Sequence, residues 1–233
     1  MSLHRLLPLA FPMAALLAAP RAQGDWGVAY GPEDRASSRP AIVFLHGMWG
    51  SPEDSCEPFE MGAAPFGFLV CPRGNAPLGD AGNGLMMWSG GYADVAHSIH
   101  AALDAADALA PGKRATQDGT LIGYSNGAYF AAEVAYSEPG RWSGLVLLSM
   151  KLDLDPKHLA RAGVKRVLLA AGDRDDVHTS MQDLASRLNQ NGGPVEARYM
   201  SLGDVGHAFP ADMPTRMCAA IAWVRGSMCT LHL

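Results

Sequence analysis

The feature of this chain that most constrains its fold is a regular alternation between short apolar runs and longer segments with helical periodicity. The apolar runs are rich in Val, Ile, Leu, Phe and Ala, which is typical of strands buried on both faces of a sheet. This order predicts the α/β class, with a mostly parallel sheet covered by helices on both faces. Strands are predicted at 41–45, 66–71, 120–124, 145–150, 166–171 and 195–202, and helices at 92–109, 126–137, 179–190 and 212–224.

A serine between two glycines follows the strand predicted at 120–124. The sequence Gly123-Tyr124-Ser125-Asn126-Gly127 fits the G-x-S-x-G pattern of a nucleophile on a tight turn between a strand and a helix. The glycines let neighbouring backbone approach closely, and the helix presents the positive end of its dipole to a developing oxyanion. Functional sites in such sheets gather beyond the carboxyl ends of the strands. We therefore expect Ser125 to be a catalytic nucleophile.

A serine hydroxyl needs a base, and the base needs an acid that orients it. On a strand-turn-helix serine of this kind, the chain order is serine, acid, histidine. His207 follows the last predicted strand and is the expected base. Asp175 and Asp176 follow the strand at 166–171, and Asp153 follows the preceding strand, so these three aspartates are the candidates for the acid.

Two backbone amides are expected to hold the oxyanion. One belongs to Asn126, the residue after the nucleophile, and the other to the loop after the first central strand. That loop reads His46-Gly47-Met48-Trp49-Gly50, and the amide of Met48 is the expected donor because Gly47 lets the backbone turn. We expect His46 to brace the loop through hydrogen bonds.

These motifs resemble the α/β-hydrolase superfamily over residues 41–224, and within it the phospholipase/carboxylesterase group. The form Gly-Tyr-Ser-Asn-Gly-Ala is also similar to secreted esterases of the polyhydroxyalkanoate-depolymerase and feruloyl-esterase kind. The resemblance implies an α/β-hydrolase fold and hydrolysis of carboxylic esters without a cofactor. It also implies that Asp175 is the acid, because in resembling enzymes the acid stands three residues after the glycine that ends the strand, here Gly172. The matching segments are 45–47, 71–77, 86–88, 123–127, 172–175 and 206–207.

The same resemblance bears on the substrate. By analogy, an apolar pocket beside the site is lined by Met48, Trp49, Met86, Met87 and Trp88, although Trp88 equally fits a core or loop contact. Large Met and Trp side chains suit an adaptable pocket. The N-terminal segment and the cysteines are foreign to the cytosolic acyl-thioesterases of the group, so their substrates are not carried over. The chain leaves little room for a lid, and we expect a small-molecule or polymeric ester as substrate.

Residues 1–24 have the pattern of a secretory signal peptide. A short basic start precedes an apolar run at 6–19, and Ala22 and Gly24 supply small residues at the two positions that a signal peptidase reads. The run is short for a hydrocarbon core of about 30 Å, and the alternative is a buried N-terminal helix. We expect cleavage after Gly24, a single domain over 25–233 with no membrane span, and a secreted or periplasmic location.

Four cysteines lie in the predicted mature chain, and an even count in an exported protein is typical of disulfides. Of the three possible pairings we prefer Cys56–Cys71 and Cys218–Cys229, because each closes a short local loop. The second requires the chain to turn back after Gly226, since one continuous helix would separate these cysteines by roughly 16 Å. No two cysteines have close metal-ligand spacing, so no metal site is expected.

Composition narrows the function further. The formal net charge is −5 and no block of like charge is present, so we expect no binding to nucleic acid. An exported serine esterase is the first hypothesis. A serine peptidase on the same fold shares the triad but usually carries an extra substrate-filtering domain, for which there is no room here. A non-catalytic binding protein would be expected to have lost a triad member, and none is missing. No pattern indicates an oligomeric state.

Overall fold

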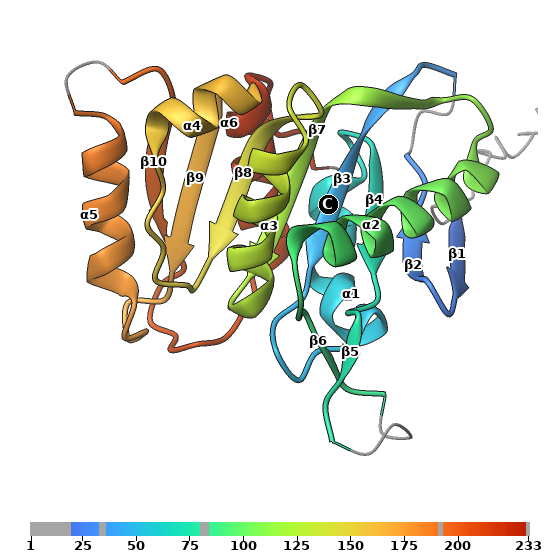
Figure 1. Ribbon diagram of the computed structural model, residues 1–233, viewed down its shortest axis with the longest axis horizontal. Helices are drawn as coiled ribbons and strands as arrows, with labels where there is room; N and C mark the ends of the chain where they lie inside the picture. The colour runs from blue at the N-terminus through green and yellow to red at the C-terminus, as the bar shows by residue number, and fades with distance from the viewer. Residues whose placement is uncertain (1–19, 33–35, 80–83, 191–192, 232–233) are drawn as a thin grey trace, which may run out of the picture.

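The computed structural model describes residues 20–32, 36–79, 84–190 and 193–231. In this part of the chain, the main sheet consists of β1 (Arg21–Gly24), β2 (Gly27–Tyr30), β3 (Arg39–Leu45), β4 (Phe68–Pro72), β7 (Arg114–Tyr124), β8 (Trp142–Leu148), β9 (Arg166–Ala171) and β10 (Glu196–Ser201). The strands lie in the order β1-β2-β4-β3-β7-β8-β9-β10 (Figure 1). From β4 to β10 neighbouring strands are parallel, whereas β2 pairs antiparallel with β4, and β1 with β2.

Helices cover both faces of this sheet, as predicted. One face is covered by α2 (Tyr92–Ala106), α3 (Asn126–Ser137) and α5 (His178–Leu188), with α4 (Pro156–Ala162) packed against α3. The other face is covered by α1 (Pro52–Ala63) and α6 (Met213–Arg225), which also pack against each other. Figure 1 shows α2 and α3 in front of the sheet and α6 behind it.

The apolar runs form strands because both of their faces are buried. In β8, Leu145 and Leu147 point to the layer of α3 and α5, while Val146 and Leu148 point to the layer of α1 and α6. This alternation follows from the two-residue period of a strand, and it explains why the run is continuously apolar. The two buried layers hold the strands in register, and their carboxyl ends therefore lie along one edge of the sheet.

A small hairpin projects from that carboxyl edge, which is the lower edge in Figure 1, where the arrowheads of β8 and β9 point. Its strands are β5 (Ala76–Pro77) and β6 (Met86–Met87). The amide of Met86 donates to the carbonyl oxygen of Gly50 at 2.9 Å, and the two residues form an isolated antiparallel bridge. The hairpin is thereby joined to the loop that follows β3.

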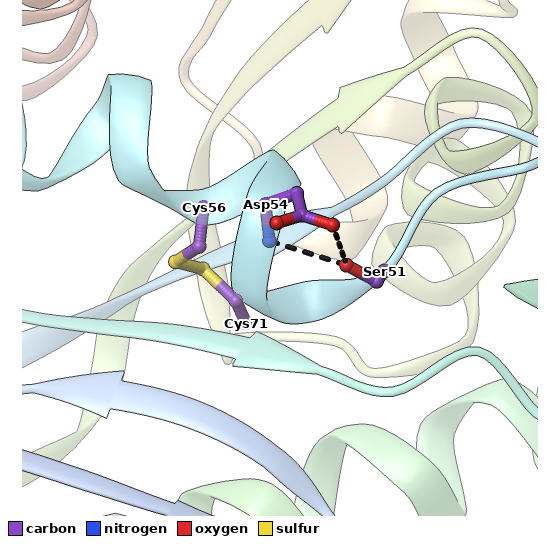
Figure 2. The surroundings of a disulfide bond; sticks show 4 residues. All are labelled: Ser51, Asp54, Cys56 and Cys71. Carbon is purple, nitrogen blue, oxygen red and sulfur yellow. Dashed lines mark hydrogen bonds between the residues drawn. A yellow bond between two sulfur atoms is a disulfide. The ribbon is translucent and has the colours of Figure 1, made fainter. Parts of the chain in front are cut away.

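Both predicted disulfides are present. Cys56, on the first turns of α1, is bonded to Cys71 on β4, with Cα atoms 6.1 Å apart (Figure 2). Ser51 is the N-cap of the same helix, and its hydroxyl oxygen accepts a hydrogen bond from the amide of Asp54 at 3.2 Å. Two disulfides are typical of proteins that fold in an oxidising compartment.

The second disulfide joins Cys218 on α6 to Cys229 in the tail, with Cα atoms 5.4 Å apart. The helix ends at Arg225, and Gly226 adopts a left-handed conformation with φ 64°. This glycine lets the chain turn back along the helix. The predicted bond between Cys218 and Cys229 required such a turn after Gly226.

Several elements differ from those expected. The strands β1 and β2 and the helices α1 and α4 were not predicted, because β1 and β2 are short segments among glycines and α1 contains Pro58. The strand β7 begins at Arg114 rather than Thr120, because its polar first part pairs with the start of β3. A 3₁₀ turn at Asp107–Leu109 replaces the end of the predicted helix 92–109.

The predicted signal peptide lies mostly outside the described residues, which begin at Pro20. Its last residues form β1, so cleavage after Gly24 would remove this edge strand and leave β2 at the edge. Within the described part of the chain, no helix is both long and apolar enough to cross a membrane.

Candidate active site

Ser125 occupies the turn between β7 and α3 in a backbone conformation that a non-glycine residue rarely adopts. Its φ is 53° and its ψ is −122°, and its amide donates to the carbonyl oxygen of Leu148 on the neighbouring strand at 2.8 Å. A left-handed φ at a non-glycine residue costs energy and marks a position held by its surroundings. The turn follows β7 directly and opens α3, as the sequence predicted.

Both glycines that flank Ser125 are required by close backbone contacts. A Cβ atom on Gly123 would lie 2.4 Å from the carbonyl oxygen of Gly127, and one on Gly127 would lie 2.2 Å from that of Leu45. Such approaches are too close for any side chain. The glycines therefore let the serine turn press against the end of β3 and the loop that follows it.

The loop after β3 brings the two predicted oxyanion donors next to the serine turn. A Cβ atom on Gly47 would lie 3.3 Å from the Cβ atom of Ser125, so the backbone before Met48 passes close to the serine. Asn126 is the first residue of α3, where amides have no acceptor within the helix. Among the described residues, neither the Met48 amide nor the Asn126 amide donates a hydrogen bond. Both are therefore available to an oxyanion.

His46 holds the loop after β3 in place. Its side chain is buried, with Nδ1 2.7 Å from the carbonyl oxygen of Gly47, and its Nε2 accepts from the amide of Gly74 at 3.1 Å. An Nε2 that accepts must be unprotonated, so the proton lies on Nδ1 and donates to Gly47. Burial lowers the pKa of His46, which keeps the imidazole neutral.

Trp88 connects the loop after β3 to α3. Its indole N–H donates to the carbonyl oxygen of His46 at 2.9 Å, and its backbone amide donates to Oδ1 of Asn126 at 2.8 Å. The exposed fraction of Trp88 is 1%, so the residue is a core contact in this structure. The Asn126 side chain thus joins the start of α3 to the residue that follows the hairpin strand β6. The sequence did not predict this contact.

The other predicted pocket residues retain exposed surface. Met48 is 46% exposed and Trp49 is 61% exposed, with Trp49 in a left-handed conformation at φ 66°. Met86 and Met87 are partly buried on β6, and Met86 is bonded to Gly50 at the end of the same loop. These four side chains belong to the loop and hairpin beside the serine, and their role as a substrate pocket stays a prediction.

Among the three candidate acids, Asp175 is hydrogen-bonded to His207. The distance from its Oδ2 to Nδ1 of His207 is 3.0 Å, and its Oδ1 accepts from the amide of Val177 at 3.2 Å. The Asp175 side chain is 3% exposed, whereas that of His207 is 50% exposed. Asp153 is fully exposed and lies 4.0 Å from Arg187, and Asp176 is exposed as well. The geometry therefore favours Asp175 as the residue that orients the imidazole.

The acid loop and the histidine loop are bonded into one unit. The amide of Asp173 donates to the carbonyl oxygen of Gly203 at 2.8 Å, and the amide of Arg174 donates to that of Val205 at 3.0 Å. The Arg174 guanidinium also pairs with Asp204 at 2.8 Å. These three contacts join the two loops. The backbone as well as the side chains therefore holds Asp175 next to His207.

Tyr124 links the histidine to the serine turn. It directly precedes Ser125, and its ring centroid lies 5.1 Å from that of His207. Burial, together with the negative charge of Asp175, raises the pKa of Tyr124 to about 12, so the phenol stays neutral beside the imidazole. The three segments that carry the predicted serine, acid and base therefore meet at the carboxyl edge of the sheet.

Comparison with known proteins supports the fold. No protein-family model and no curated protein sequence matches this chain. Among solved structures, a carboxylesterase from Mesorhizobium loti is 24% identical, with a TM-score of 0.60, covering 88% of this chain and 99% of its own.

Two further structures are similar at lower identity. The fluorophosphonate-binding serine hydrolase FphF of Staphylococcus aureus is 14% identical with a TM-score of 0.61, covering 85% of this chain and 91% of its own. An S-formylglutathione hydrolase from Agrobacterium tumefaciens is 13% identical with a TM-score of 0.61, covering 90% of this chain and 94% of its own. This chain has the α/β-hydrolase fold that such proteins share.

Proposed function

We propose that this chain with the α/β-hydrolase fold is an exported serine esterase that hydrolyses carboxylic esters through an acyl-enzyme. The observation that carries the proposal is the hydrogen bond between His207 and Asp175 beside a strained serine turn, next to which the amides of Met48 and Asn126 have no acceptor among the described residues. Serine hydrolases and esterases among the structurally similar proteins support the same reaction class.

In the proposed mechanism, the hydroxyl oxygen of Ser125 attacks the ester carbonyl carbon while Nε2 of His207 takes the hydroxyl proton. The carbonyl oxygen becomes an oxyanion and accepts hydrogen bonds from the amides of Met48 and Asn126. Asp175 holds Nδ1–H of the imidazole and stabilises the imidazolium. When the tetrahedral intermediate collapses, His207 gives its proton to the leaving alcohol, and the acyl group stays on the serine.

The second half of the reaction repeats these steps with water. His207 removes a proton from water as the water oxygen attacks the acyl carbon, and the same amides hold the new oxyanion. Collapse breaks the bond to Ser125, and the imidazole returns the proton to the serine oxygen. The products are an alcohol and a carboxylic acid, and no cofactor enters the atom balance.

The test is the Ser125→Ala variant, assayed with nitrophenyl acetate and labelled with a fluorophosphonate probe. We expect both hydrolysis and labelling to be lost, whereas Ser98→Ala, at a partly exposed position on α2, should retain both. A Ser125→Ala protein with near wild-type hydrolysis would refute the assignment. A wild-type protein that is labelled but cleaves only peptides in a substrate panel would favour the peptidase.

Export is part of the proposal, supported by the N-terminal pattern and the two disulfides. Fractionation followed by N-terminal sequencing tests it. We expect the protein outside the cytoplasm with a mature chain that starts at Asp25. A start at or before Arg21 would retain β1 and contradict cleavage after Gly24, and an uncleaved cytoplasmic chain would contradict export.

A further inference from the structure

A groove lies at the opposite edge of the sheet from the candidate active site, where the parallel strands begin. It has a volume of about 600 Å³, and its lining includes Asp118, Ser143, Lys165, Arg166, Glu196 and Arg225. The strand β8 runs from this groove toward the serine edge, and its seven residues span roughly 20 Å. The groove is therefore separate from the candidate active site.

Arg225, the last residue of α6, is the feature of this groove that needs an explanation. It also lines a neighbouring hollow of about 570 Å³ that includes Arg114 and Asp118, so its side chain lies between two open spaces. Its Nη1 is buried without an acceptor, and among the described residues the guanidinium makes no hydrogen bond or ion pair. Burial and the charge of Arg39 lower the pKa of Arg225, and the negative charge of Asp118 only partly offsets them.

The acidic side chains of the groove are already paired with other cations. Glu196 accepts from Nε of Arg166 at 2.8 Å, and Asp118 lies 3.2 Å from Nζ of Lys165. In the neighbouring hollow, Arg114 is paired with Asp107 at 2.7 Å. Among the described residues that line this groove, three cations stand against two carboxylates, and Arg225 is the cation that makes no ion pair. A partly buried cation without a partner is costly, and an anion that enters the groove would remove that cost.

We propose that this groove binds a small anion through Arg225, namely a phosphate or carboxylate group. A guanidinium presents its N–H groups as a planar fork that matches both kinds of group in a bidentate manner. The Ser143 hydroxyl and the Lys165 ammonium line the same groove and supply further donors. The site does not depend on the proposed esterase reaction, because it lies at the other edge of the sheet.

The test measures Tm in sodium phosphate and in sodium acetate, with sodium chloride added to keep the ionic strength constant. An anion that binds the folded state raises Tm, by about 3–6 °C at roughly ten times its Kd. We expect this increase in the wild type and in Arg187→Gln, a control on α5. We expect no increase in Arg225→Gln, and a smaller one in Arg225→Lys, which retains the charge but not the fork.

A rise in Tm with phosphate alone would indicate a phosphate site, and a rise with acetate alone would indicate a carboxylate site. A rise with both would indicate that the groove accepts either group. Without added anion, Arg225→Gln should have a Tm equal to or above that of the wild type, because it removes an unpaired charge. An equal anion effect in Arg225→Gln, or no effect of either anion on the wild type, would overturn the proposal. The readout is independent of catalysis, so its failure leaves the esterase proposal unaffected.

Discussion

The buried carboxylate of Asp175 lies 3.0 Å from Nδ1 of the half-exposed imidazole of His207, and this contact joins two loops that follow different strands. A buried acid and an accessible base suit their proposed roles. The acid is shielded from water, which strengthens its hold on the imidazole, while the opposite face of the ring remains open to reactants.

Replacement of Asp175 with Asn should lower kcat for nitrophenyl acetate by about 10³–10⁴-fold, because the imidazole loses the partner that fixes its tautomer. The matched control is Asp176→Asn, one residue away and exposed, which should stay near the wild-type rate. Steady-state kinetics with both variants checks this prediction. A larger loss in Asp176→Asn than in Asp175→Asn would transfer the acid role to Asp176.

Replacement of Gly127 with Ala should destabilise the protein by about 3 kcal/mol or more, because the new Cβ atom would lie 2.2 Å from Leu45 O and 2.5 Å from His46 O. The control is Gly91→Ala, where the nearest atom is 3.8 Å away, and there the cost should be a few tenths of a kcal/mol. Urea unfolding measures both. Similar midpoints for the two variants would show that the serine turn and the β3 loop are not in close contact.

The lowered pKa of His46 makes a contribution to stability that depends on pH. The unfolded histidine binds a proton near pH 6.5 while the folded one stays neutral, so this contribution is complete above pH 6.5 and is lost as the pH falls below that value. His46→Gln should be less stable at pH 7.5 but lose less stability between pH 7 and pH 5.

Urea unfolding at several pH values tests the role of His46, with His97→Gln as an exposed histidine control. We expect the control to keep the wild-type pH slope. If His46→Gln kept that slope as well, the buried imidazole would not be the group that titrates.

Loss of the Cys56–Cys71 disulfide should lower the free energy of unfolding by about 3 kcal/mol, since the bond closes a loop of 15 residues. The double variant Cys56→Ala, Cys71→Ala should also lose activity at lower temperature than the wild type, because β4 leads into Gly74, which bonds to His46. Thermal unfolding and residual activity measured together check this. An unchanged Tm would mean that the bond adds no stability.

The segments of the candidate active site could be predicted because each depends on local sequence. The G-x-S-x-G pattern between an apolar run and a helix indicated the turn at Ser125, and the strand ends placed His207 and the aspartates at one edge. The choice among Asp153, Asp175 and Asp176 required the structure or a family resemblance, because all three stand in loops after strands. Gly74, Tyr124 and the side chain of Asn126 could not be assigned from their local surroundings.

The sequence by itself determined the α/β class and the position of the serine turn, and it favoured the disulfide pairs that the structure has, since apolar periodicity, glycine spacing and short loop closure act over a few residues. Only the tertiary structure decided which carboxylate meets His207, how Trp88 and His46 brace the loop after β3, and that Arg225 has no hydrogen-bond or ion-pair partner among the described residues. These three features depend on contacts between residues far apart in the chain. The packing of the two helical layers on the sheet sets the distances between such residues, and a local sequence pattern carries no information about them.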